Sequence, residues 1–326
     1  MTGTTTWAEL ISQPEAWASL IARLQSGALS LPVDPASYQE FLLLGSGSSY
    51  YLARSVADWM LRRGFDARAV ASCEVMLDPY ETRASGTKRL AIGFSRSGQS
   101  SELLLANAKL RAAGFDLLGI SCTSGCDLLE QVDHPILIHE GREDGLVMLR
   151  SFTTMLITAQ WLFGSAEDRA ALSLLPQAGR QMLGHVPALQ DLAQARAYDR
   201  FVYLGSGSQH PLTQEAALKV QEMAMATSEA YYSLDYRHGP KGCADGYDGH
   251  FVCLVGPGLW AGFGTGYPGL GGGADRHRAG CCGLCRGRGH DDPAARHDLC
   301  RGGGGGFVAA RSDVCLFQRA QTRAKS

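Results

Sequence analysis

The sequence predicts an α/β protein with two related halves, each a parallel sheet covered by helices. Short, continuously apolar segments such as 41–44 and 90–94 alternate with segments of helical periodicity. Strands that are buried on both faces of a parallel sheet have this composition. In addition, the motif LLGSGS at 43–48 returns as YLGSGS at 203–208. A repeat at this distance indicates a duplicated domain and not a solenoid.

The elements of the first half follow from the spacing of apolar residues and from the glycines that end helices. An N-terminal helix over 7–24 and a linker over 29–35 come first. We then expect, in order, a strand at 41–44, a helix at 50–61, strands at 68–71 and 90–94, a helix at 102–113, strands at 117–121 and 136–138, and a helix at 151–163.

The second half repeats this alternation of strands and helices and is followed by a segment of different composition. Helix 177–197, strand 201–204, helix 212–226 and strand 251–255 are expected there. Beyond Pro257 the chain is dense in glycine and arginine, a composition that cannot bury a core and predicts irregular coil. The expected organisation is a helix and linker at 1–35, domains at 36–170 and 171–256, and a tail at 257–326.

Composition and charge exclude several classes of protein. With 326 residues and 45% hydrophobic content, the chain can bury a core of ordinary size. A formal net charge of −2 supplies no field that would hold nucleic acid or an anionic membrane. No signal peptide or run of about eighteen apolar residues is present. We therefore expect a cytoplasmic protein that binds neither nucleic acid nor membrane.

A serine-rich loop after the strand at 90–94 is the first candidate site. In SRSGQSSE at 95–102, Ser95, Ser97 and Ser100 lie just before a helix, and Gly98 allows close backbone approach. Helix N-terminal amides and hydroxyls together bind phosphate well. The alternative is an ordinary helix cap, since serine favours that position. Four serines within seven residues exceed what capping requires, so the loop predicts a phosphate site.

The loop at 45–49, GSGSS, is a second candidate of the same kind. A dinucleotide site begins similarly, but the third glycine of that fingerprint is replaced by Tyr50. Two hydroxyl-rich loops at neighbouring strand ends fit one phosphosugar better than a pyrophosphate.

The helix at 212–226 carries the candidate acid–base groups. Glu215, Lys219 and Glu222 have i, i+4 and i+7 spacing, which places them on one face. The alternative is a solvated stripe of ion pairs. Downstream, His238 precedes Gly239 and Pro240, a rigid turn that suits a histidine that must be aimed. A lone histidine is more often a surface group.

Five segments together resemble a known family. They are GSGSSY, SRSGQSSE, EDGLVMLRSFTTM, LGSGSQHPLTQEAALKVQE and RHGPK, spread over about residues 40 to 255. They are similar to the isomerase half of glucosamine-6-phosphate synthase and to stand-alone amino-sugar-phosphate deaminases and isomerases, which are double sugar-isomerase (SIS) domain proteins. The resemblance implies two SIS subdomains, each a flavodoxin-like parallel sheet in a three-layer αβα arrangement.

The resemblance also implies roles for individual residues and a reaction. Glu222 would move a proton between sugar carbons C1 and C2, His238 would open the ring, and Glu215 and Lys219 would support them. The implied phosphate ligands are Ser48, Ser49, Ser95, Arg96, Ser97 and Ser100, supported by Gly45, Gly47, Gly98, Gly205 and Gly207. No metal or cofactor is implied, and members are homodimers with the site at the interface. The expected reaction converts a glucosamine-6-phosphate-like substrate to fructose-6-phosphate and ammonia.

This chain departs from the family at several positions. Arg96 replaces a glutamine, and Met148 and Leu149 replace hydroxyl residues. Thr2 follows Met1 where the synthase has a cysteine nucleophile, so we expect chemistry with free ammonia and not with glutamine. The family's closing lysine has no counterpart in the tail, which a shifted reading frame would explain.

Three alternatives remain open from the sequence. The chain is a non-catalytic phosphosugar-binding regulator, or a copy impaired by its altered C-terminus, or the enzyme described above. In the tail, Cys282, Cys285, His297 and Cys300 have the spacing of a zinc site, although shifted frames of GC-rich DNA also yield such residues.

Overall fold

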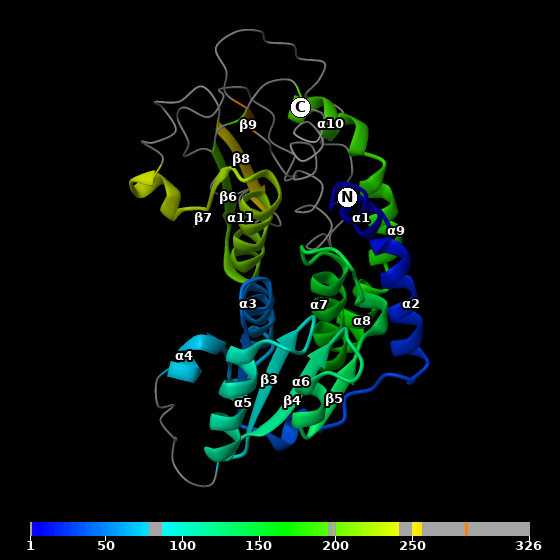
Figure 1. Cartoon of the computed structure of the whole chain (residues 1–326), viewed down its shortest axis with the longest axis vertical. Helices are drawn as coiled ribbons and strands as arrows, with labels where there is room; N and C mark the ends of the chain where they lie inside the picture. Colours follow the sequence, from blue (N-terminus) through cyan, green and yellow to red (C-terminus); the bar gives the residue numbers. More distant parts are fainter. Residues whose placement is uncertain are drawn as a thin grey trace. The chain divides into compact units, whose positions relative to one another are not determined.

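The computed structural model describes residues 2–77, 87–194, 198, 200–240, 250–255 and 284–285, which fall into two compact units, Met1–Gln181 and Met182–Ser326 (Figure 1). Each unit is built on its own sheet. The first unit contains, in order, α1 (Thr2–Ile11), α2 (Gln13–Gln25), the 3-10 helix η1 (Pro35–Ser37), β1 (Glu40–Gly45), α3 (Ser48–Leu61), β2 (Ala67–Ala71), α4 (Ser72–Leu77), β3 (Arg89–Ser95), α5 (Ser101–Ala112), β4 (Asp116–Ser121), α6 (Asp127–Gln131), β5 (His134–Leu137), η2 (His139–Gly141), α7 (Arg150–Phe163) and α8 (Ala166–Leu172).

The first sheet has the order β2-β1-β3-β4-β5, and every pair of neighbouring strands is parallel. All residues of β1 and β3 are buried, as expected for strands covered on both faces. The predicted parallel sheet flanked by helices is thus confirmed. Strand order reverses between β1 and β3, and at such a switch point open α/β sheets bind their ligands.

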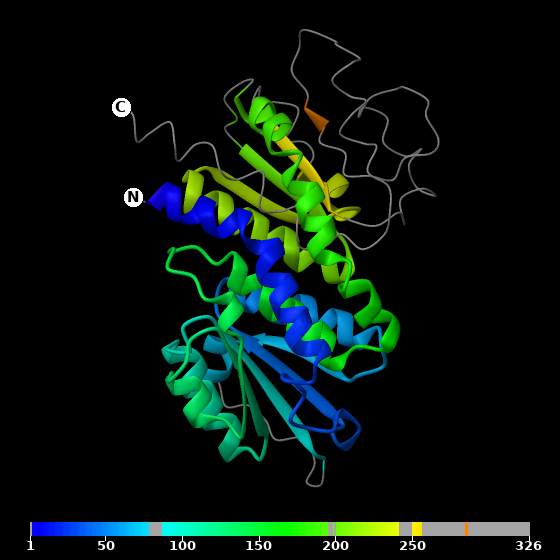
Figure 2. The same cartoon turned by 90° about the vertical axis from the view of Figure 1, so that its right-hand side faces the viewer.

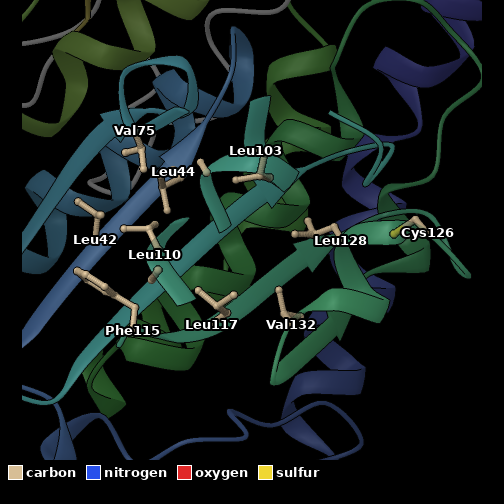
Figure 3. Packing of buried hydrophobic residues seen from close by; sticks show 12 residues of the cluster. Leu42, Leu44, Val75, Leu103, Leu110, Phe115, Leu117, Cys126, Leu128 and Val132 are labelled. Carbon is tan, nitrogen blue, oxygen red and sulfur yellow. The ribbon is translucent and has the colours of Figure 1, made fainter. Parts of the chain in front are cut away.

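Helices cover both faces of this sheet (Figures 1 and 2). On one face, α4, α5 and α6 pack on the strands, and Figure 3 shows the buried cluster between them, which includes Val75, Leu103, Leu110 and Leu128. On the other face α3 contacts β1, β3 and α7. There the ring of Phe41 lies 5.4 Å from Phe65 and 5.9 Å from Phe163, both edge-on. The sheet is therefore held rigidly from both sides.

The N-terminal segment forms two helices where one was expected over 7–24. The first ends at Ile11, and Pro14 occupies the first turn of α2. Proline has no N–H and its ring clashes with the preceding turn, so a single helix cannot run through this position. Helix α2 packs on α7, and the buried Trp17 indole donates a hydrogen bond to Thr153 Oγ1 at 2.8 Å.

The second unit is built around a sheet of order β7-β6-β8-β9. Strands β6 (Arg200–Gly205), β7 (Thr227–Tyr232) and β8 (His250–Val255) pair in parallel, and β9 (Leu284–Cys285) pairs antiparallel with β8. One face packs on α11 (His210–Ala224) through Tyr203, Ala216 and Val220. The remaining elements are α9 (Leu175–Leu183), which crosses the unit boundary, α10 (Val186–Gln194), η3 (Gly207–Gln209) and η4 (Asp235–His238).

Several expectations need correction or lie elsewhere. The helix expected at 177–197 is two helices, α9 and α10. Two residues of the expected coil, 284–285, form β9. The rest of 257–326, with the frame-shift hypothesis and most of the zinc candidate, lies outside the described residues. In the described part of the chain, no helix has the length and apolarity required to cross a bilayer.

Candidate functional site

Two serine- and glycine-rich loops lie at the switch point of the first sheet. One joins β1 to α3, and the other joins β3 to α5. Because β1 and β3 are parallel neighbours, with Leu44 opposite Gly93, both loops emerge at the same carboxyl edge. Each leads directly into a helix N-terminus, whose free N–H groups and dipole favour an anion. The two loops predicted to share one phosphate are therefore adjacent.

The first loop is shaped by its glycines. Gly47 has φ +56°, which favours glycine, and it precedes the first turn of α3. A Cβ on Gly45 would lie 2.3 Å from the backbone carbon and oxygen of Ser49, so only glycine fits there. Ser48 and Ser49 begin α3 and are buried. Both predicted phosphate ligands therefore lie in the first turn of the helix. The Ser49 hydroxyl also lies 3.7 Å from the Met148 sulfur.

The second loop divides its serines between two tasks. The hydroxyl of Ser95 is buried, accepts the Gly98 N–H at 3.0 Å and bonds the Ser100 hydroxyl at 3.1 Å. Ser97 is exposed, and its hydroxyl accepts the Gln99 N–H at 3.2 Å. Ser100 is half-buried and occupies the N-cap position of α5, where its side chain makes no capping hydrogen bond. In this conformation the buried Ser95 holds the loop together through hydrogen bonds within it, whereas Ser97 lies at the protein surface.

Arg96 connects this loop to the segment 143–149. Its Nη1 donates to the Gly145 carbonyl at 2.9 Å and lies 3.6 Å from Glu143 Oε1. Glu143 is fully buried, and it accepts hydrogen bonds from the N–H groups of Leu149 and Arg150 and from the Ser151 hydroxyl at the start of α7. Burial raises the pKa of Glu143, opposed by these hydrogen bonds and by Arg96. The Arg96 guanidinium is thus held by a neighbouring loop.

Glu143 is a residue that the sequence reasoning missed. It lies within the segment EDGLVMLRSFTTM, whose resemblance to the family implies no role for it. It lies seven positions before α7 and reaches the N-terminus of that helix only through the fold of the loop, so residue spacing alone gave no signal of this contact.

The loop after β6 in the second unit has the same backbone feature as the loop after β1. Gly207 has φ +57°, against +56° for Gly47. A Cβ on Gly205 would lie 2.7 Å from Thr213 Cγ2 and 3.0 Å from the Gln209 carbonyl oxygen. The sequence echo therefore reflects a shared strand-to-helix turn.

The predicted acid–base residues form an ion cluster on α11. Lys219 is 1% exposed and Glu215 is 3% exposed. The Lys219 ammonium lies 3.2 Å from Glu215 Oε1 and also donates to Glu222, whose side chain is 39% exposed. A solvated stripe is therefore wrong for Glu215 and Lys219. The ammonium instead bridges a buried carboxylate and an accessible one, which fixes the position of Glu222.

His238 ends η4 in the same unit and is exposed. Arg237 Nε donates to His238 Nε2 at 3.1 Å. Gly239 and Pro240 follow η4 directly, and Gly239 has φ +147°, whereas Lys241 lies outside the described residues. Among the residues that are described, no group of three or more His, Cys, Asp or Glu side chains is arranged to hold a metal ion.

Comparison with known proteins relates the first unit to a known domain family. Residues 38–165 match the SIS domain family. The chain is 27% identical over 274 residues to a D-galactosamine-6-phosphate deaminase of Escherichia coli, covering 75% of this chain and 68% of the deaminase. It is 25% identical over 246 residues to a glutamine–fructose-6-phosphate aminotransferase of Pyrobaculum aerophilum, covering 71% of this chain and 40% of the aminotransferase. The chain thus spans well under half of the aminotransferase.

A solved structure shares the fold. The crystal structure of a glucosamine-6-phosphate deaminase from Thermotoga maritima aligns with a TM-score of 0.69 and 23% identity, covering 98% of this chain and 95% of that one. The SIS match does not reach the second unit, so the expected double arrangement stays a prediction. Residues 38–165 therefore form an SIS domain, and the chain is homologous to phosphosugar aminotransferases and amino-sugar-phosphate deaminases.

Proposed function

We propose that this protein is a phosphosugar isomerase or deaminase acting on a 6-phosphorylated amino sugar, with a glucosamine-6-phosphate-like substrate and water giving fructose-6-phosphate and ammonia. The observation that carries the proposal is the pair of serine- and glycine-rich loops at the switch point between β1 and β3. The activities for which the relatives are named, deamination of galactosamine-6-phosphate and amino transfer to fructose-6-phosphate, support the substrate class.

The loops supply what a phosphoryl group needs. Two helix N-termini direct N–H groups toward the same sheet edge, and each adds hydroxyls: Ser48 and Ser49 on α3, Ser97 and Ser100 before α5. A dianion is stabilised by such donors without any net positive charge on the protein. We propose that these residues hold the phosphate, with Ser95 and Gly98 fixing the loop that presents Ser97.

The ion cluster on α11 supplies the proton-transfer group. Moving a proton between C1 and C2 requires a carboxylate that takes it from a carbon next to a carbonyl or imine and returns it one carbon away. We propose that Glu222 does this, since its carboxylate is accessible while Lys219 holds it in place. His238 is proposed to open the sugar ring, and the active form is proposed to be a cytoplasmic homodimer.

The test separates binding from turnover. Glucosamine-6-phosphate should raise the melting temperature of the full chain, because a ligand that binds only the folded state stabilises it. Ser97→Ala should reduce this shift, whereas Ser26→Ala, at an exposed position at the end of α2, should leave it unchanged. Glu222→Gln should abolish ammonia release and keep the shift. Turnover that survives in Glu222→Gln would contradict the assignment of the base, and binding without turnover in the unsubstituted chain would favour a regulator.

A further inference from the structure

The loop 142–149 is held in place by a glutamate of the N-terminal helix α1. Glu9 Oε1 accepts the N–H of Asp144 at 2.7 Å and the N–H of Gly145 at 2.9 Å. Glu9 is 4% exposed, and its other carboxylate oxygen, Oε2, has no hydrogen-bond partner among the described residues. One buried carboxylate therefore fixes two successive backbone N–H groups of a loop more than 130 residues away.

Arg150 and Ser12 add further contacts between the N-terminal helices and this loop. Arg150 Nη2 lies 4.0 Å from Glu9 Oε1, and Arg150 Nη1 donates to the Ser12 hydroxyl at 3.1 Å. Arg150 also donates to the carbonyl of Arg142 at the start of the loop. Arg150 thus joins the junction of α1 and α2 to the C-terminal end of the loop and also bonds the first residue of the loop.

Gly145 links Glu9 to the loop between β3 and α5, the second of the two proposed phosphate-binding loops. A Cβ on Gly145 would lie 2.3 Å from Glu9 Oε2, so the carboxylate reaches the backbone only because residue 145 is glycine. The carbonyl of Gly145 accepts the hydrogen bond from Arg96, and Arg96 is part of the loop between β3 and α5. Gly145 therefore contacts Glu9 through its N–H and Arg96 through its carbonyl, and so links the two side chains.

We propose that Glu9 is a positioning residue for ligand binding. It fixes the loop 142–149 and, through the Gly145 carbonyl, the position of Arg96 within the loop between β3 and α5. Helix α1 lies outside the residues that match the SIS domain, yet it belongs to the binding apparatus. The inference rests on the proposed function for the identity of the ligand. It does not depend on that function for the contact itself.

The experiment uses the full chain and the variants Glu9→Ala, Glu9→Gln and, as a matched control, Glu15→Ala. Glu15 lies on α2 and forms an exposed ion pair with Arg180. The first readout is hydrogen exchange of the amides in 142–149 without ligand. The second is the affinity for glucosamine-6-phosphate, measured by titration calorimetry and compared with the affinity for inorganic phosphate.

We expect Glu9→Ala to speed exchange at Asp144 and Gly145, and to weaken glucosamine-6-phosphate binding, by about tenfold each, the effect of losing charge-assisted hydrogen bonds. Glu9→Gln should restore most of both, because its amide oxygen still accepts two N–H groups. Glu15→Ala should change neither. A purely structural role would lower the melting temperature without this paired change and without rescue by glutamine.

Opposite results would overturn the inference. Unchanged exchange in Glu9→Ala, with normal phosphosugar binding, would overturn this inference and leave the proposed function untouched. Faster exchange with unchanged affinity would show that the loop contact does not reach the ligand. Should Glu9→Ala fail to fold, Gly145→Ala displaces the carboxylate instead and must give the same pair of changes. If the unsubstituted chain binds no phosphosugar, the proposed function and the affinity part fall together, and exchange still decides on the contact.

Discussion

At the scale of single residues, Lys219 occupies an energetically costly position, because its charged side chain is buried. A buried ammonium loses its hydration, and only close carboxylates compensate for this. Glu215 and Glu222 provide them, one buried and one accessible. Removing one member of a buried pair costs more than the pair itself contributes, because a charge is left in a place of low dielectric constant.

Lys219→Met should therefore destabilise the second unit by about 3–5 kcal/mol, since it leaves the buried Glu215 carboxylate without its ammonium. The double variant Glu215→Leu, Lys219→Met should recover part of this loss. Glu222→Gln, at the accessible end of the cluster, should cost less than about 1 kcal/mol. Urea unfolding of the three variants measures these differences. Equal stability of Lys219→Met and the unsubstituted chain would contradict the buried pair.

Residue roles were predictable from the sequence only where the partner is close in the chain. The serine loops are contiguous with the helices that they precede, so Ser97 and Ser100 could be proposed directly. That Ser95 faces inward could not, because it depends on the packing of Gly98 against Cys126. Glu9 could not be identified either. Its partners are backbone N–H groups 135 and 136 positions away, which have no side-chain signature.

At the scale of elements, the strongly apolar strands and the long helices were predictable, and short polar elements were not. Helices α4 and α8 have six and seven residues, too few to show a helical period. Strand β7 was missed because TSEAYY is polar and lies next to a helix. Helix α8 is stabilised locally by a capping box between Ser165 and Asp168, and from a distant part of the sequence by Arg63, which follows α3 and donates to Asp168.

The contact between α8 and α3 predicts a dependence of stability on pH. The hydrogen bond from Arg63 lowers the pKa of Asp168 from 3.8 to about 2. A carboxyl group with a lowered pKa in the folded state contributes stability above its unfolded pKa and loses it as the pH falls through the folded value. Allowing for partial exposure of both groups, Asp168→Asn should cost about 1 kcal/mol at pH 7.

The difference between Asp168→Asn and the unsubstituted chain should shrink between pH 4 and pH 2, as Asp168 takes up a proton. Guanidinium unfolding at several pH values measures it. Glu15→Gln, whose ion pair with Arg180 is exposed, serves as control and should show a smaller change. A difference for Asp168→Asn that stays constant down to pH 2 would contradict this account.

At the scale of the whole molecule, the first unit extends beyond the SIS domain at its N-terminal side. Trp17, Leu20, Ile21 and Leu24 are buried, and α2 packs on α7. Burying each such side chain contributes about 1.5–3 kcal/mol, so together they are comparable with the total stability of a domain. A boundary placed at residue 36, as the sequence suggested, separates these helices from the domain that they complete.

A fragment of residues 1–181 should therefore melt cooperatively, whereas a fragment of residues 36–181 should aggregate or melt without a sharp transition. Circular dichroism during heating and size-exclusion chromatography of the two fragments test this. A shorter fragment that is as stable as the longer one would show that α1 and α2 contribute little to the fold.

The hydrogen bond between Trp17 and Thr153 spans 136 positions, and this has a consequence for synthesis in the cell. A ribosome adds roughly 5–20 residues per second, so about 7–27 seconds pass between the emergence of the tryptophan and that of its acceptor. Throughout this interval the apolar side of the nascent N-terminal segment faces water. Newly made chains should therefore be clients of a chaperone that acts at the ribosomal exit tunnel until translation has passed residue 163.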